Sequence, residues 1–112
     1  MKNIICLCGS TKEKIAFKKA MRDEALKGNA VFTVAQYSHA DNLVLTEAEK
    51  IKFDERHLFQ IDCCDEVFVL NVGGRIGEST QKEIDYASKV SKKIRYLEPI
   101  KWKRLFYTYM QI

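Results

Sequence analysis

A single carboxylate interrupts an otherwise apolar helical stripe in the second half of the chain. Within Ser79–Ser91, the inward positions at helical spacing are Thr80, Glu83, Ile84, Ala87 and Val90. A carboxylate in such a stripe either caps backbone amides or pairs with a lysine, or it stands partly desolvated beside a ligand crevice. Glu83 is therefore the first candidate for a reacting group.

Two loops rich in glycine and hydroxyl groups each follow an apolar run. Main-chain amides and hydroxyl groups at the start of a helix bind anions, although the same residues serve equally well as helix caps. The candidate ligand-binding residues in these loops are Gly9, Ser10, Thr11, Lys12, Gly77, Ser79 and Thr80.

Short apolar runs alternate with helical patterns along the chain. We expect strands at 3–8, 30–34, 66–72 and 93–97, because each is a short apolar run bounded by turn residues. We expect three helices. The first is capped by Ser10 or Thr11, with Glu13 three residues after Ser10 as in a capping box. The second runs from Thr46, with Glu49 three residues on, to about 62. The third occupies 79–91. The apolar face of the first helix is predicted from Ile15, Phe17, Ala20, Met21, Ala25 and Leu26.

This alternation predicts a three-layer α/β fold of the flavodoxin- or Rossmann-like kind. Its parallel sheet has four to five strands in the order 2-1-3-4, with right-handed crossovers. Ligands of such sheets bind outside the carboxyl ends of the strands, where the strand order reverses. That position lies between the first and third strands, so the two glycine- and hydroxyl-rich loops are expected to be neighbours.

Length and composition fit one globular domain. The chain has 112 residues, 46% of them hydrophobic and 30% charged. No apolar run approaches the roughly 20 residues of a membrane helix, and the apolar N-terminal stretch is too short for a signal peptide, so we expect a cytoplasmic protein. Three of the four units of net charge come from Lys101, Lys103 and Arg104, which leaves +1 for residues 1–100. A net charge of +1 over residues 1–100 does not favour nucleic-acid binding, which depends on attraction to the phosphate backbone.

The four cysteines lie in apolar runs and lack the C-x-x-C spacing of a zinc or redox site. Cys6, Cys8, Cys63 and Cys64 are therefore interpreted as buried free thiols rather than as two disulfides. No metal or other cofactor is expected.

Four segments in a fixed order carry a family resemblance: Cys8-Gly9-Ser10, Asp65–Val69, the glycine-rich loop 73–80 and Glu83–Ala87. Together, over roughly residues 3–97, they resemble the nucleoside 2-deoxyribosyltransferase superfamily, which includes 2′-deoxynucleoside 5′-phosphate N-hydrolases. The resemblance implies cleavage or transfer of the N-glycosidic bond of a (deoxy)nucleoside or its 5′-monophosphate. In that family, the glutamate of a Glu-x-x-x-Ala helix start attacks C1′ of the sugar, and Glu83 with Ala87 matches it.

The resemblance also assigns the binding residues. Gly9, Ser10 and Thr11 match the first loop of the family, which holds the sugar or its 5′-phosphate, and Lys12 stands where phosphate-using members often have arginine. Tyr37 and His39 lie where relatives line the base pocket, so they either stack on the base or belong to an ordinary surface loop.

One departure concerns the partner of the nucleophile. Several family members have an aspartate eight residues before the aspartate that opens the third strand, and in this chain that position is His57. Asp54, one turn earlier on the same helical face, or Asp62, closer to the strand, is a possible substitute, and a His57–Asp54 pair could also be purely structural. The loss of the aspartate leaves an alternative open, a nucleotide-binding sensor or regulatory module without turnover.

The resemblance divides the chain into a nucleoside 2-deoxyribosyltransferase-like domain, 1–98, and a C-terminal tail, 99–112. The tail mixes basic and aromatic residues, and we expect it to pack on the body or on a partner subunit. Family members are dimers or larger, and a four-stranded sheet has edges that need covering, so a homodimer or larger homo-oligomer is expected.

Overall fold

A computed structural model describes residues 2–100 of the chain. The elements are, in order, β1 (Ile4–Cys8), α1 (Lys14–Leu26), β2 (Ala30–Phe32), α2 (Glu47–Cys63), β3 (Glu66–Val69), a 3₁₀ turn (Val72–Gly74), α3 (Glu78–Lys89) and β4 (Lys93–Tyr96). The interpretation of residues 99–112 as a packed tail falls, from residue 101 on, outside the described residues.

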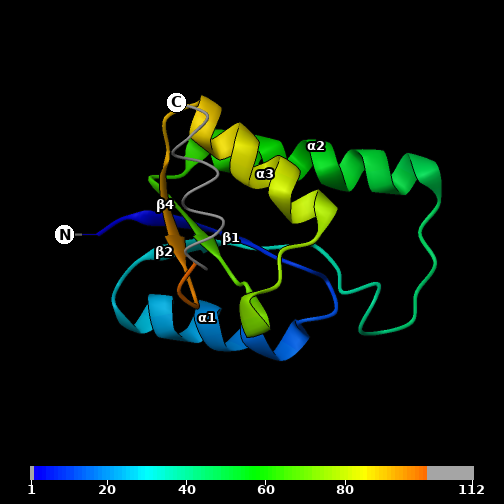
Figure 1. Ribbon diagram of the computed structural model, residues 1–112, viewed down its shortest axis with the longest axis horizontal. Coiled ribbons are helices and arrows are strands. Elements are labelled where there is room, and N and C mark those ends of the chain that lie inside the picture. The colour runs from blue at the N-terminus through cyan, green and yellow to red at the C-terminus, as the bar shows by residue number, and fades with distance from the viewer. Residues whose placement is uncertain (1, 101–112) are drawn as a thin grey trace.

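The four strands form one parallel sheet in the order β2-β1-β3-β4, as the sequence predicts. Figure 1 shows α1 on one side of the sheet and α2 and α3 together on the other, which makes three layers. The register pairs Ile5 of β1 with Val31 on one side and Glu66 on the other. β1 and β3 are thus the central strands.

Alternate side chains of the central strands build two separate cores. On the side of α2 and α3, the core consists of Cys6, Cys8, Ile61, Cys64, Val67, Val69, Ile84 and Ala87. On the side of α1, it consists of Ile5, Leu7, Phe17, Ala20, Phe68 and Leu70. The predicted inward stripe of α3 faces the sheet, and its residues Thr80, Ile84 and Ala87 are buried as expected.

The start of α2 matches the sequence prediction in detail. The Thr46 hydroxyl accepts a hydrogen bond from the Glu49 amide at 3.1 Å, and the Glu49 carboxylate accepts one from the Thr46 amide at 2.9 Å. This reciprocal capping box satisfies two amides that would otherwise lack a partner within the helix.

The first helix differs from its prediction. No side chain caps it: α1 begins at Lys14, after Glu13, so the expected cap by Ser10 or Thr11 and the capping box of Ser10 with Glu13 do not form. The residues preceding Lys14 belong instead to the loop that leaves β1. Of the predicted apolar face, only Phe17 and Ala20 are buried. Ile15 is 85% exposed and Leu26 is 72% exposed. Met21 is about half exposed, and Ala25 is also exposed.

The third buried residue of α1 is Glu24, whose side chain is 2% exposed. Its carboxylate accepts a hydrogen bond from Arg95 of β4 at 2.6 Å, and Arg95 also donates to Glu66 at 2.8 Å. Burial acts to raise the pKa of Glu24, but the hydrogen bonds from Lys27 and Arg95 outweigh it and lower the pKa. Glu24 therefore occupies a buried position that would otherwise suit an apolar residue, because Arg95 of β4 pairs with its carboxylate.

Other differences are small. β2 ends at Phe32 rather than 34 and β3 at Val69 rather than 72, because each pairing with β1 ends there. All four cysteines are free, but Cys63 is exposed and only Cys6, Cys8 and Cys64 are buried, so the prediction that Cys63 is buried is wrong. Among residues 2–100, no helix has the length and apolar character to span a membrane.

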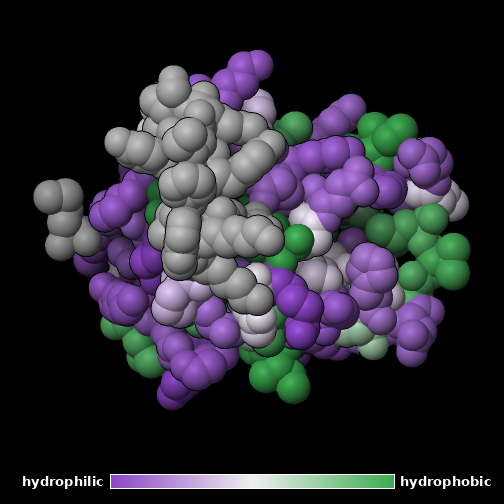
Figure 2. Space-filling view, in the orientation of Figure 1, coloured by the Kyte–Doolittle hydropathy of each residue, from purple (hydrophilic) through white to green (hydrophobic). Residues whose placement is uncertain are grey.

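Apolar side chains gather on the surface beside the loop that precedes α2. Figure 2 shows them in green at the right edge, over this loop. In that loop, Val44 is 96% exposed and Leu43 is about half exposed. Exposed apolar groups next to a cavity are typical of surfaces that bind a partner or a ligand.

Candidate functional site

A pocket of about 500 Å³ opens at the carboxyl ends of β1 and β2. Its walls come from four parts of the chain, residues 9–11, 34–45, 50–57 and 77–83. The loop after β1 and the segment that opens α3 are neighbours here, as the strand order predicts. The volume lies within the range typical of small-molecule sites.

The first loop approaches the sheet closely at Gly9. A Cβ atom at this position would lie 3.3 Å from Leu70 on β3's exit and 3.3 Å from the Phe17 ring of α1. Only glycine fits this contact without displacing a neighbour. The absence of a side chain lets the start of this loop, which lines the pocket, lie directly against Leu70 and Phe17.

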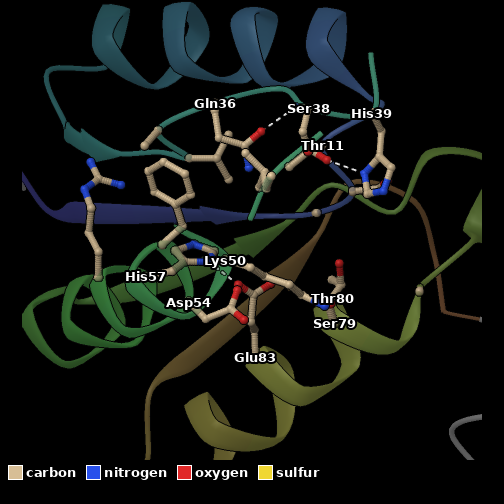
Figure 3. A pocket seen from close by; sticks show the side chains of 18 of the residues that line it. Thr11, Gln36, Ser38, His39, Lys50, Asp54, His57, Ser79, Thr80 and Glu83 are labelled. Carbon is tan, nitrogen blue, oxygen red and sulfur yellow. Dashed lines mark hydrogen bonds and ion pairs between the residues drawn. The ribbon is translucent and has the colours of Figure 1, made fainter. Parts of the chain in front are cut away.

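One face of α2 supplies the charged groups of the pocket. Lys50, Asp54 and His57 are spaced at i, i+4 and i+7, so they project from the same side of the helix. Figure 3 shows these side chains directed toward the pocket from α2, opposite Glu83 of α3. The side chains of Lys50 and Asp54 have no hydrogen-bond or ion-pair partner within residues 2–100 and are available to a ligand.

Glu83 and His57 form an ion pair on the pocket floor. Nδ1 of His57 faces a carboxylate oxygen of Glu83, and the two side chains are 8% and 18% exposed. The pair joins α3 to α2 and fixes the Glu83 carboxylate in one orientation. Its second oxygen has no partner among the described residues and remains available to the pocket.

Both ring nitrogens of His57 face acceptors. Nε2 lies 2.9 Å from the main-chain carbonyl of Leu7, and Nδ1 faces the Glu83 carboxylate. Two acceptors require two N–H groups, which only the imidazolium form has. Burial alone would lower the pKa of His57, but hydrogen bonds to Cys6 and Glu83 and the Glu83 charge raise it to about 10. The ring therefore carries a positive charge at neutral pH.

Hydrogen-bond donors line the part of the pocket formed by the start of α3 and the loop after β1. The helix α3 begins after Gly77, and the main-chain amides of its first turn have no partners within the helix. Ser79 is exposed, whereas the Thr80 side chain is buried, and both line the pocket beside Ser10 and Thr11. Such a helix start favours an anionic group.

Two loop contacts shape the pocket mouth. The Thr11 hydroxyl forms a short hydrogen bond with Nδ1 of His39, which ties the loop after β1 to the loop after β2. Nearby, Lys14 of α1 pairs with Asp41 at 2.9 Å. These contacts hold the long loop between β2 and α2 across the carboxyl end of the sheet.

Most of the residues predicted from the sequence meet at this pocket. It is lined by Gly9, Ser10, Thr11, His39, Asp54, His57, Gly77, Ser79, Thr80 and Glu83.

Three predicted residues lie elsewhere. Lys12 is exposed and Tyr37 packs edge-on against Phe17, and neither lines the pocket. Asp62 is exposed near the end of α2, where its carboxylate accepts a hydrogen bond from the Tyr86 hydroxyl at 2.6 Å. Of the three candidate partners of Glu83, His57 is the one that contacts it.

The sequence reasoning missed two cations and two polar residues of the pocket: Lys50, Arg56, Gln36 and Ser38. Arg56 also donates to the main-chain carbonyl of Thr33 at 3.2 Å. The i, i+4, i+7 spacing of Lys50 with Asp54 and His57 is visible in the sequence and would have indicated that Lys50 shares their face.

Comparison with models of known families and with curated protein sequences gives no match for this chain.

Proposed function

We propose that the protein cleaves or transfers the N-glycosidic bond of a (deoxy)nucleoside or its 5′-monophosphate, with Glu83 as the nucleophile. The main support is the position of Glu83, on the floor of the pocket with one oxygen held by His57 and the other open to a ligand. The resemblance of the loops and of the Glu83–Ala87 segment to the deoxyribosyltransferase superfamily points to the same reaction.

In the proposed reaction, a Glu83 carboxylate oxygen bonds to C1′ while the C1′–N bond breaks, and its electron pair leaves with the base. Negative charge beside C1′ stabilises the oxocarbenium-like transition state. The departing base needs a proton, and Asp54, which lines the same pocket, is the candidate to deliver it. Water or a second base then attacks C1′ and gives its proton to the Asp54 carboxylate, while the C1′–O bond to Glu83 breaks and both carboxyl groups return to their starting forms.

The charged groups of the pocket favour a 5′-monophosphate over a free nucleoside. Lys50 has no partner among residues 2–100, and Arg56 lines the same wall. The free amides at the start of α3 add donors suited to phosphate oxygens. We place the phosphate between this helix start and the hydroxyl groups of Ser10 and Thr11.

A second copy of the chain is the proposed partner. Leu43 lines the pocket and is about half exposed, and Val44 next to it is 96% exposed. A neighbouring subunit that covers this loop would bury these side chains and close one side of the pocket. The cytoplasm is the proposed location, since four free cysteines fit a reducing compartment.

The test is to incubate the protein with a panel of deoxyribonucleotides, ribonucleotides and nucleosides and to follow free base by chromatography. Glu83→Gln keeps the shape of the side chain and should abolish base release. Intact-protein mass spectrometry should detect a glycosyl adduct on the unsubstituted protein and none on the variant. Base release that persists unchanged in Glu83→Gln excludes the nucleophile assignment.

A binding module without turnover is the second candidate function. The observation that favours it is that an imidazolium, rather than the aspartate of the family, stands next to Glu83 and neutralises its charge. In that case, calorimetry should detect nucleotide binding in the unsubstituted protein, while no free base is released over long incubation.

A further inference from the structure

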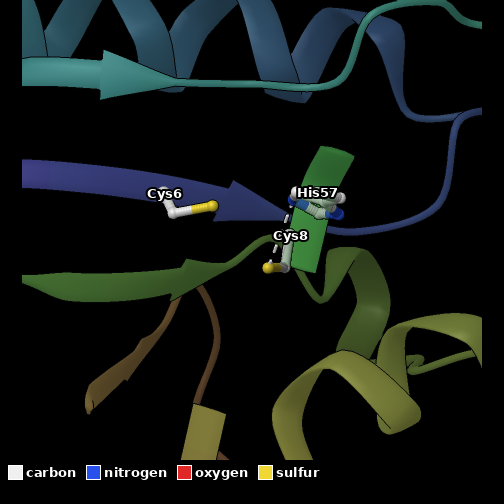
Figure 4. Close-up of side chains that lie close together, drawn as sticks. All are labelled: Cys6, Cys8 and His57. Atoms are coloured by element: carbon white, nitrogen blue, oxygen red, sulfur yellow. Dashed lines mark hydrogen bonds between the residues drawn. The ribbon is translucent and has the colours of Figure 1, made fainter. Parts of the chain in front are cut away.

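Beneath the pocket floor, two thiols and one imidazole converge inside the core. Cys6 and Cys8 are separated by one residue on β1 and therefore project from the same face of the sheet, toward α2. One donor atom from each of Cys6, Cys8 and His57 lies within 4.8 Å of the others, and all three residues are buried. Figure 4 shows Cys8 at the end of β1 beside His57 and Cys6 further back on the same strand.

The spacing of these donors suits a tetrahedral metal centre. The Sγ atom of Cys8 lies 3.7 Å from Nε2 of His57. Zinc bonds of about 2.3 Å to sulfur and about 2.05 Å to nitrogen, at a tetrahedral angle, place the two donors roughly 3.6 Å apart. The observed separation therefore already matches one edge of a zinc tetrahedron.

The far side of the imidazole carries the contact that zinc ligands usually have. A metal-bound histidine typically donates its other ring N–H to a carboxylate, which fixes the ring and increases its basicity. Nδ1 of His57 faces Glu83 in this way, while Nε2 lies between the Leu7 carbonyl at 2.9 Å and Sγ of Cys8 at 3.7 Å. The Glu83–His57 pair thus leaves Nε2 on the side of the Cys8 thiol.

We propose that Cys6, Cys8 and His57 bind one Zn²⁺ ion through Sγ, Sγ and Nε2, with Glu83 as the outer partner of the imidazole. On binding, the two thiol protons and the Nε2 proton leave to solvent, and Nε2 exchanges its hydrogen bond to Leu7 for the bond to zinc. His57 lines the pocket, so the ion reaches the cluster through the pocket floor. Three protein donors are the number found in zinc sites that keep one position open.

This site goes beyond the proposed reaction and does not depend on it. Its formation is measured without any nucleotide, so failure of base release leaves the metal site untouched. Conversely, absence of metal binding leaves the proposed nucleophile in place.

The experiment uses Cys63→Ala as the reference protein, because Cys63 is the exposed thiol and would bind metal at the surface. Metal-free reference protein is titrated with Zn²⁺ against a chromophoric chelator, and separately with Co²⁺ as a spectroscopic probe. We expect one ion per chain, thiolate-to-cobalt charge-transfer absorption and tetrahedral cobalt bands. A rise in melting temperature with added Zn²⁺ should accompany binding.

Cys6→Ala and Cys8→Ala, each made in the reference protein, remove one donor and keep a small apolar side chain in the core. Each should lower Zn²⁺ affinity by more than roughly 100-fold, beyond the usual effect of losing an outer partner. Circular dichroism checks that both variants fold. Lack of charge-transfer absorption in the reference protein overturns the proposal without any variant. A Zn²⁺ affinity that is unchanged in both single variants also overturns it.

Discussion

His57 of α2 and Glu83 of α3 form an ion pair at the base of the pocket, with the imidazole ring held from its other side by the main chain of β1. The pair connects the two helices that cover this face of the sheet. It therefore belongs both to the core and to the surface on which a ligand would lie.

Breaking this pair should destabilise the fold. His57→Gln leaves the Glu83 carboxylate without its counter-charge, and we expect a loss of about 3 kcal/mol in the free energy of unfolding. Glu83→Gln should cost a similar amount, because a buried imidazolium then lacks its partner. In the double variant, the two losses should overlap by about 1–3 kcal/mol. Urea unfolding of the four proteins measures this coupling, and strictly additive losses would contradict it.

The pair also predicts how stability depends on pH in the metal-free protein. The pKa of His57 is raised from 6.5 to about 10, so the folded state holds its proton more tightly than the unfolded chain. The stabilisation is fully present below pH 6.5 and is lost as the pH rises through about 10. Urea unfolding between pH 6 and 10.5 should show this decline. His57→Gln is the control, and an equal decline in that variant would assign the effect to other groups.

Lys50 should contribute to binding a 5′-phosphate, whereas Lys12 should not. Lys50 lines the pocket and has no partner within residues 2–100, but Lys12 is exposed outside it. If the proposed reaction holds, Lys50→Ala should raise the KM for nucleoside monophosphates roughly tenfold, equivalent to about 1.4 kcal/mol. The KM for the free nucleosides should change little. Lys12→Ala is the matched control, and equal effects of both substitutions would refute the assignment of Lys50.

Two threonines should respond to substitution in opposite directions. The Thr33 hydroxyl is buried without a hydrogen-bond partner in the described residues, so Thr33→Val should raise the free energy of unfolding by about 1 kcal/mol. Thr46→Ala removes the capping box of α2 and should lower it by about 1 kcal/mol. Thermal unfolding of both variants checks the contrast, which a loss of stability in Thr33→Val would disprove.

Local sequence patterns predicted the strand order, the capping box at Thr46 and the inward position of Glu83. The capping box and the position of Glu83 depend on residues a few positions apart, and the strand order follows from the alternation of strands and helices along the chain. The contact between His57 and Glu83 depends on how α2 and α3 cross over the sheet, and no local pattern encodes that crossing. The family resemblance predicts an aspartate at position 57. This chain has His57 there, and His57 itself contacts Glu83.

The inward face of α1 shows a different limit. Apolar spacing selected Ile15 and Leu26, yet both are exposed while Glu24 is buried. The partner that stabilises Glu24 is Arg95, 71 positions away along the chain. Helix periodicity predicts that charged residues face solvent. It carries no information about a counter-charge so far away in the sequence.

The central position of β1 in the sheet has a consequence for folding during synthesis on the ribosome. β1 is made first, but its register with β3 pairs Ile5 with Glu66, so its second neighbour emerges only after the whole of α2. Until then, one edge of a central, largely buried strand has no partner, and unpaired edges favour association with other chains. Nascent chains that end before β3 should therefore depend on chaperones, whereas chains that extend past β4 should not.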